Sequence, residues 1–276
     1  KTAEDFGMQG ERPSHGELLD WLAAEFRDSA WDVKALVRLI VTSHTYRQSS
    51  RATPTLIERD PENRLLARGT RYRLPAWMIR DQALAASGLL VRRMGGPPVK
   101  PYQPAGVWEE ATFGNKRYQE DEGEALYRRS LYTFWRRIVG PTMFFDNAAR
   151  QVCSVRPSRT NTPLHALATL NDGTYVEAAR MLAERVIHEA GEKPEARIER
   201  AFRLLLARRP TADESRILLD TLGKLRQQFT DSPDTATQLL QVGRSKRDDR
   251  IDPLEHAAYT ALCSAVLNLD ETLSRE

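Results

Sequence analysis

The chain has 276 residues and a mass of 31.4 kDa, with 41% hydrophobic and 29% charged residues. This composition excludes a disordered polar chain, and the length suits one large or two small domains. The 41 basic and 38 acidic residues leave a net charge of +3, which gives no clear footprint for nucleic acid. No apolar run approaches the ~18 residues of a membrane helix. We therefore expect neither a nucleic-acid partner nor a membrane span.

The first part of the chain predicts two neighbouring helices. Ser14 and Glu17 have the spacing of a capping box, in which two side chains accept from the free amides of a helix start. Asp32 predicts the N-cap of a second helix. Apolar residues recur at helical spacing in both segments: Leu18, Leu19, Leu22 and Phe26, then Val33, Leu36, Val37, Ile40 and Val41.

Two further helices are expected before residue 100. We expect a loop from Thr53, followed by a short helix that Asp60 caps and that runs to Leu66. Pro75 predicts the start of a longer helix. The Gly-Gly-Pro-Pro sequence at 95–98 predicts its end, because these residues interrupt a helix.

Residues 99–123 have no helical period. Prolines and glycines interrupt this segment, and four aromatic residues are distributed along it: Tyr102, Trp108, Phe113 and Tyr118. A loop of this length is often functional, and its rings either pack the loop or contact a ligand. Residues 127–139 fit a helix, although 129–134 include β-favouring residues, and we expect a helix there.

The last hundred residues predict regular helices, because cap and first-turn signals recur: Asp172, Pro194, Thr211 with Glu214, and Pro253. We therefore expect an all-α fold, an irregular multi-helix bundle with a long aromatic-, Pro- and Gly-rich loop region in the middle. It is expected to form a single domain over 1–276, with a weak subdivision into a loop-rich part, 1–170, and a regular part, 171–276. The chain starts at Lys1, and we expect it to be a fragment of a longer protein.

General motifs assign no chemistry to the chain. No two of the five histidines lie four residues apart, and there is no HExxH, GxSxG or P-loop sequence. We predict no metal site, no cofactor bound by this chain and no assigned catalytic residue. Cys153 and Cys263 are expected to be small buried apolar residues, and a mutual disulfide is the alternative.

One segment concentrates polar groups at a predicted helix start. Arg159, Thr160, Asn161 and His165 surround Pro163, where exposed amides favour an anion. Arg128 and Arg129 are candidate members of the same site. Two interpretations stay open: a ligand site, or a buried polar network that holds an irregular loop. Trp108 and Tyr118 are additional ligand-binding candidates.

Ordered sequence blocks along nearly the whole chain carry a family resemblance. They are EDFG (4–7), GE (10–11), HGELLDWLA (15–23), SHTYRQSS (43–50), NRLLAR (63–68), IRD (79–81), RRSLY (128–132), VCSVR (152–156), RTNTPL (159–164), AL (166–167), LND (170–172) and LNLDE (267–271). Together they resemble the planctomycete-specific domain of unknown function, which typically forms the C-terminal part of large exported proteins with a cytochrome-c-like domain upstream.

The resemblance implies export to the periplasm or cell surface and a c-type haem in a separate upstream domain. It supplies no reaction, substrate or catalytic residue. Many members carry Gln at the position of His165, which argues against an essential histidine there.

Two functions follow. The first is a non-catalytic binding or scaffold module that contacts the upstream haem domain or a polysaccharide through the aromatic loop. The alternative is an enzyme that acts on an anionic or carbohydrate substrate through the Arg/Asn/His cluster.

Overall fold

The computed structural model describes residues 2, 5, 7–136, 139–141, 144–146, 155 and 159–275. The chain divides into two compact units. Unit 1 comprises residues 1–72, 153–157 and 274–276, and unit 2 comprises residues 73–152 and 158–273. Each unit is described separately below.

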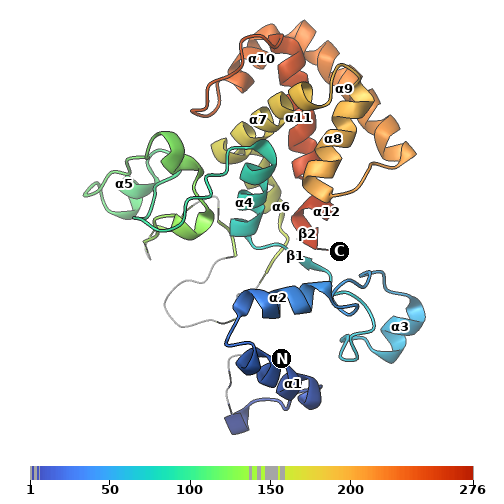
Figure 1. The fold of residues 1–276 in the computed structure, drawn as a ribbon. Helices are drawn as coiled ribbons and strands as arrows, with labels where there is room; N and C mark the ends of the chain where they lie inside the picture. Colours follow the sequence, from blue (N-terminus) through green and yellow to red (C-terminus); the bar gives the residue numbers. More distant parts are fainter. Residues whose placement is uncertain are drawn as a thin grey trace. The chain divides into compact units, whose positions relative to one another are not determined.

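The expected all-α fold is confirmed (Figure 1). Unit 1 contains η1 (Gly7–Gln9), α1 (Gly16–Asp28), α2 (Val33–Thr42) and α3 (Pro54–Arg59). Unit 2 contains α4 (Ala76–Ser87), α5 (Val107–Ala111), η2 (Gly123–Tyr127), η3 (Ser130–Tyr132), α6 (Pro163–Asn171), α7 (Gly173–Glu189), α8 (Pro194–Leu206), α9 (Ala212–Asp231), α10 (Pro233–Leu240), α11 (Pro253–Leu267) and α12 (Asp270–Leu273). The strands β1 (Tyr72–Arg73) and β2 (Ser274–Arg275) pair in a two-stranded sheet. In the described part of the chain, no helix combines the length and apolar character that a membrane crossing requires.

The two predicted N-terminal helices are present, and one of their two predicted caps is correct. The Asp32 side chain accepts from the amide of Ala35 and caps α2. The capping box at Ser14 is wrong, because His15 is the N-cap of α1 and makes no side-chain cap bond. The Ser14 hydroxyl instead bonds Nδ1 of the His15 ring at 3.0 Å.

The short third helix lies earlier than predicted. Thr53 caps α3 by accepting from the amide of Leu56, where a loop was expected. Asp60 follows the helix instead of starting it. Its carboxylate accepts from the amides of Arg64 and Leu65 at 2.8 and 2.7 Å and holds an irregular turn. Both Thr-Pro and Asp-Pro are good helix starts, and the chain uses the first.

The middle of unit 2 is irregular, as expected, apart from the short helix α5. α4 ends at Gly88, which adopts the left-handed conformation, several residues before the predicted Gly-Gly-Pro-Pro end. The predicted helix over 127–139 is wrong for the described residues. This segment instead pairs with earlier backbone, because the amides of Val91 and Val99 donate to the carbonyls of Tyr127 and Tyr132.

The C-terminal helices form as predicted. Asp172 accepts from the amide of Thr174 at the start of α7, and Thr211 with Glu214 forms a capping box at α9. Pro194 and Pro253 stand in the first turns of α8 and α11. The expected seam near residue 171 lies inside unit 2, between α6 and α7.

The core of unit 2 is centred on α7 and α11. α11 contacts α7, α8, α9 and α10 (Figure 1). Fully buried alanines on both helices allow this close approach: Ala178, Ala179, Ala183, Ala257 and Ala258. Cys263 of α11 is also buried, and burial raises the pKa of its thiol to about 12. Cys153 lies outside the described residues, so the predicted choice between buried thiols and a disulfide stays open.

Candidate functional site

The polar residues predicted before α6 lie together around Asp146. The carboxylate of Asp146 accepts from the backbone amide of Thr160 at 2.6 Å and from its hydroxyl at 2.8 Å. Nε2 of His165 lies 3.9 Å from the same carboxylate. The ring of Phe145 stacks on the His165 ring, with 4.0 Å between centroids. Asp146 was not predicted from the sequence.

An arginine from β1 completes this cluster. Arg73 donates to the side-chain oxygen of Asn161 at 2.8 Å, and Arg159 donates to the Arg73 carbonyl at 3.2 Å. Nδ1 of His165 and Nε of Arg73 are buried and have no hydrogen-bond partner among the described residues. Arg159, Thr160, Asn161 and His165 therefore share one site with Asp146 and Arg73.

Arg128, another predicted ligand-binding residue, is fully buried elsewhere in unit 2. Its guanidinium donates to the carbonyls of Arg93, Gly95 and Pro97, and lies over the Tyr132 ring. This side chain holds the Gly-Gly-Pro-Pro loop in place. These contacts place it in the loop rather than in the Asp146 cluster.

Arg129 is half exposed on the neighbouring segment. Its Nε lies 3.8 Å from the carboxylate of Asp81. The same carboxylate accepts from the amide and hydroxyl of Ser130 at 2.8 and 2.6 Å. The buried Arg80 of α4 donates to the Arg128 carbonyl and to the Ser130 hydroxyl. Arg80 and Asp81 thus fix the start of the segment that the sequence predicted as a longer helix, at the short 3₁₀ helix η3.

The predicted ligand-contact rings, Trp108 and Tyr118, pack against each other. Their centroids are 5.4 Å apart, and Phe134 stacks on Trp108 at 6.0 Å. Trp108 is only 5% exposed, and its indole N–H donates to Gln103. The Tyr118 hydroxyl donates to the Pro101 carbonyl at 2.7 Å. The rings therefore pin the loop, which was one of the two open interpretations.

A buried carboxylate in α7 forms a site that sequence reasoning missed. Glu177 is fully buried and accepts from the hydroxyls of Tyr102 and Tyr127, both at 2.9 Å. It also accepts from the amides of Arg244 and Ser245 at 2.8 and 2.6 Å. Burial raises the pKa of both tyrosines, that of Tyr127 to about 12, so both stay protonated donors. A glutamate among the alanines of an apolar helix face was the available signal.

Unit 1 exposes many large apolar side chains on two of its helices. The helices α1 and α2 contain no buried residue, although both are amphipathic. We call seven of their exposed apolar side chains, each 39–61% accessible, the α1–α2 surface. Its members are Leu18, Leu19, Trp21, Val33, Val37, Ile40 and Val41.

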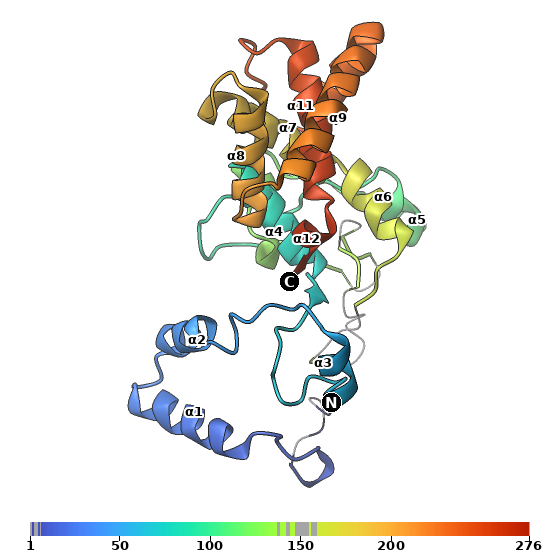
Figure 2. The same cartoon turned by 90° about the vertical axis from the view of Figure 1, so that its right-hand side faces the viewer.

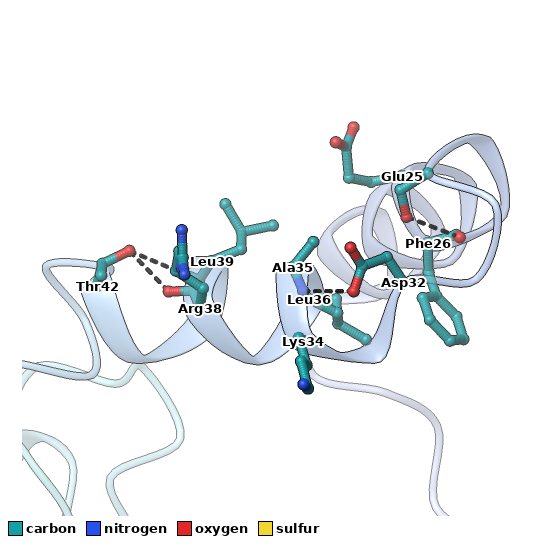
Figure 3. A pocket seen from close by; sticks show the side chains of 10 residues that line it. Glu25, Phe26, Asp32, Lys34, Ala35, Leu36, Arg38, Leu39 and Thr42 are labelled. Carbon is teal, nitrogen blue, oxygen red and sulfur yellow. Dashed lines mark hydrogen bonds between the residues drawn. The ribbon is translucent and has the colours of Figure 1, made fainter.

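Two open pockets border this surface. A pocket of about 580 Å³ lies between α1 and α2, and Figure 3 shows Glu25, Asp32, Lys34 and Arg38 among its lining side chains. A second pocket, of about 430 Å³, is more apolar. Its lining includes Leu18, Trp21, Leu22, Ile40, Tyr46 and Leu66. Figure 2 shows the short turn that joins the two helices.

Comparison with family sequence models identifies most of the chain. The model of PSD1, described as a protein of unknown function (DUF1553), matches residues 1–222. The chain belongs to the PSD1 family. The predicted membership in a family of unknown function is thereby confirmed. No curated protein and no solved structure matches the chain.

The PSD1 match includes most of the features described above. The α1–α2 surface, the Asp146 cluster and Glu177 all lie within residues 1–222. The helices α10, α11 and α12 lie beyond it. Within the described ranges, no three His, Cys, Asp or Glu side chains gather closely enough to hold a metal ion.

Proposed function

We propose that this PSD1 chain is a non-catalytic binding module that contacts another protein through the α1–α2 surface. The exposure of that surface carries the proposal. Isolated helices as short as α1 and α2, with 13 and 10 residues, are marginal in water unless packing stabilises their apolar face. Large exposed apolar areas on soluble proteins mark interaction sites, and the exposed side chains of α1 and α2 are grouped on two neighbouring helices.

The role of the predicted polar residues in unit 2 supports the same proposal. Arg128 binds loop carbonyls, and the Trp108 ring is covered by neighbouring rings. Groups that are engaged in this way stabilise the fold and offer little to a substrate. The structural role of Arg128 and Trp108 leaves the apolar helices of unit 1 and the Asp146 cluster as the candidate sites, and we assign the function to the helices.

The family resemblance extends the proposal to the location of the protein and to its neighbouring domain. We propose an exported planctomycete protein in which this chain follows a cytochrome-c-like domain that carries the haem. That domain is a proposed partner on this ground. A polysaccharide is a weaker candidate partner, because the rings of Trp108 and Tyr118 pack against each other inside the loop.

Hydroxyl-radical footprinting tests the binding function. The natural full-length protein at 100 µM is compared with the 276-residue chain at nanomolar concentration, and oxidation is read at each tryptophan. Trp21 is 51% exposed and Trp77 of α4 is 45% exposed, so Trp77 is a matched control. We expect Trp21 to be protected in the full-length protein and oxidised in the dilute chain, while Trp77 is oxidised equally in both.

Two results would contradict the binding function. Equal oxidation of Trp21 in both samples would show that no partner covers the α1–α2 surface. Protection already present in the dilute chain would show that the surface needs no partner.

The alternative function is an enzyme acting on an anionic or carbohydrate substrate. It is favoured by one observation, the buried Nδ1 of His165 and Nε of Arg73, for which the described part of the chain supplies no hydrogen-bond partner near Asp146. Differential scanning fluorimetry with inorganic phosphate and with a set of oligosaccharides tests it. Stabilisation that His165→Gln and Arg73→Gln abolish would support the alternative, and no stabilisation by any compound would count against it.

A further inference from the structure

The α1–α2 surface has the size of one side of a homodimer interface. A whole aromatic side chain has ~150–250 Å² and an aliphatic one has less, so the seven side chains, each 39–61% exposed, present roughly 500 Å² of apolar area at most. A standard interface buries roughly 800 Å² per partner, and about 65% of a homodimer interface is apolar. The surface therefore matches the apolar part of such an interface without further residues.

The charges on the two helices are complementary. α1 carries four acidic residues and one basic residue, whereas α2 carries two basic residues and no acidic residue. Arg27 of α1 pairs with its neighbour Asp28. Lys34 and Arg38 of α2 make no ion pair with any described residue. Glu25 of α1 lines the same pocket as Lys34 and Arg38, but none of the three forms an ion pair within the described part of the chain.

We propose that a second copy of this chain covers the α1–α2 surface. In a two-fold arrangement the same surface serves both copies, and α1 of each copy lies against α2 of the other. The four helices then form a bundle whose apolar stripes meet inside. The acidic residues of α1 face Lys34 and Arg38 across this interface. The inference rests on the proposed binding function and names its partner.

Sedimentation velocity of the 276-residue chain between 1 and 100 µM tests the dimer. We expect a species of twice 31.4 kDa that dissociates on dilution. Val37→Glu places a charge in the middle of the apolar stripe, at a side chain that is 51% exposed and so tolerates the change in the monomer. Because the charge is desolvated in the dimer, we expect the dissociation constant to rise at least tenfold. Ile217→Glu, at a side chain of α9 that is 55% exposed, is the matched control and should leave it unchanged.

A charge exchange tests the pairing of α1 with α2. Glu25→Lys should weaken the dimer by about threefold or more, because two identical contacts lose their attraction. Adding Arg38→Glu to Glu25→Lys should return the dissociation constant to that of the parent chain, because a basic residue at position 25 then faces an acidic residue at position 38. Both residues line the pocket in Figure 3. Far-UV circular dichroism checks that every variant remains helical.

The outcomes separate this inference from the binding function. If the chain stays monomeric at 100 µM, the proposal that a second copy covers the α1–α2 surface is wrong. The proposal is also wrong if the chain forms a dimer that Val37→Glu leaves intact. A dimer that Glu25→Lys does not weaken overturns the two-fold pairing of the helices. If the chain is monomeric but Trp21 is protected in the full-length protein, only the second copy is wrong. If Trp21 is unprotected as well, the binding function fails too.

Discussion

At the residue scale, the most constrained position in unit 2 is Gly243. Its φ of +95° is in the left-handed region, and a Cβ atom built there would contact the Glu177 side chain at distances that no real structure shows. Gly243 thereby brings the amides of Arg244 and Ser245 within hydrogen-bond distance of the buried carboxylate. One glycine and one glutamate join a loop to the core.

Gly243→Ala should therefore destabilise the chain more than an ordinary glycine substitution. The strained backbone and the displaced carboxylate together are expected to cost about 3 kcal/mol in urea-induced unfolding. Gly191→Ala is the control, because Gly191 has φ +73° and open space around its Cβ position. Gly191→Ala is expected to lower the free energy of unfolding by about 1 kcal/mol, the cost of placing a Cβ atom on a left-handed backbone alone. Equal losses in the two variants would show that the contact with Glu177 is relieved without cost.

At the element scale, the capping box of α9 predicts a pH dependence. The guanidinium of Arg208 hydrogen-bonds Glu214 and, with the amide of Thr211, lowers the pKa of that carboxyl to about 2. A carboxyl whose pKa is lower in the folded chain stabilises the fold above its unfolded pKa. This contribution is lost as the pH falls from about 4.5 towards 2.

Glu214→Gln should lower the stability at pH 7 by about 1 kcal/mol, the typical effect of losing a cap. The difference from the parent chain should shrink between pH 4.5 and 2, because the parent carboxyl is then protonated as well. Thermal unfolding at pH 7 and pH 3 measures this. Glu192→Gln, at an exposed position, is the control. A difference that is constant with pH would exclude the charged form of Glu214 as its source.

The aromatic loop carries a second prediction at this scale. Trp108→Ala should cost about 3–5 kcal/mol, as expected for removing a buried aromatic side chain. Trp77→Ala, at a half-exposed position on α4, should cost within about 0.5 kcal/mol. Chemical denaturation of both variants makes the comparison. If Trp108→Ala is as stable as the parent chain, the ring has a role other than packing.

Elements whose signals are local could be predicted from the sequence. Asp32, Asp172 and Thr211 each cap the helix that follows them, because the bond lies within three residues. The segment over 127–139 could not be predicted in this way. Its backbone pairs with Val91 and Val99, and Arg80 accounts for two more of its bonds. Long-range partners overrode its helical pattern.

The candidate sites follow the same division. Arg159, Thr160, Asn161 and His165 were predicted because they are close in sequence and remain close in space. Their partners were missed, since Asp146 and Arg73 lie outside that segment. Glu177 was missed for the same reason, because its donors come from three distant segments.

At the scale of the whole molecule, the two units differ in what they bury. Unit 2 has a core of alanine, leucine and aromatic side chains between its helices. In unit 1, by contrast, α1, α2 and α3 bury no residue. The apolar pattern of α1 and α2 was visible in the sequence, and the structure adds that most of its side chains are exposed, while Leu22, Phe26 and Leu36 are half-buried. A face of this kind points to assembly with another protein, and we assign the function to it.

A native mass spectrum of the purified chain tests this assignment most directly, since it reports assembly state and retained ligands together. The account predicts a dimer with no mass beyond two polypeptide chains, and its conversion to monomer by Val37→Glu. A monomer that retains a stoichiometric metal ion or small molecule would contradict it and would favour the enzyme alternative.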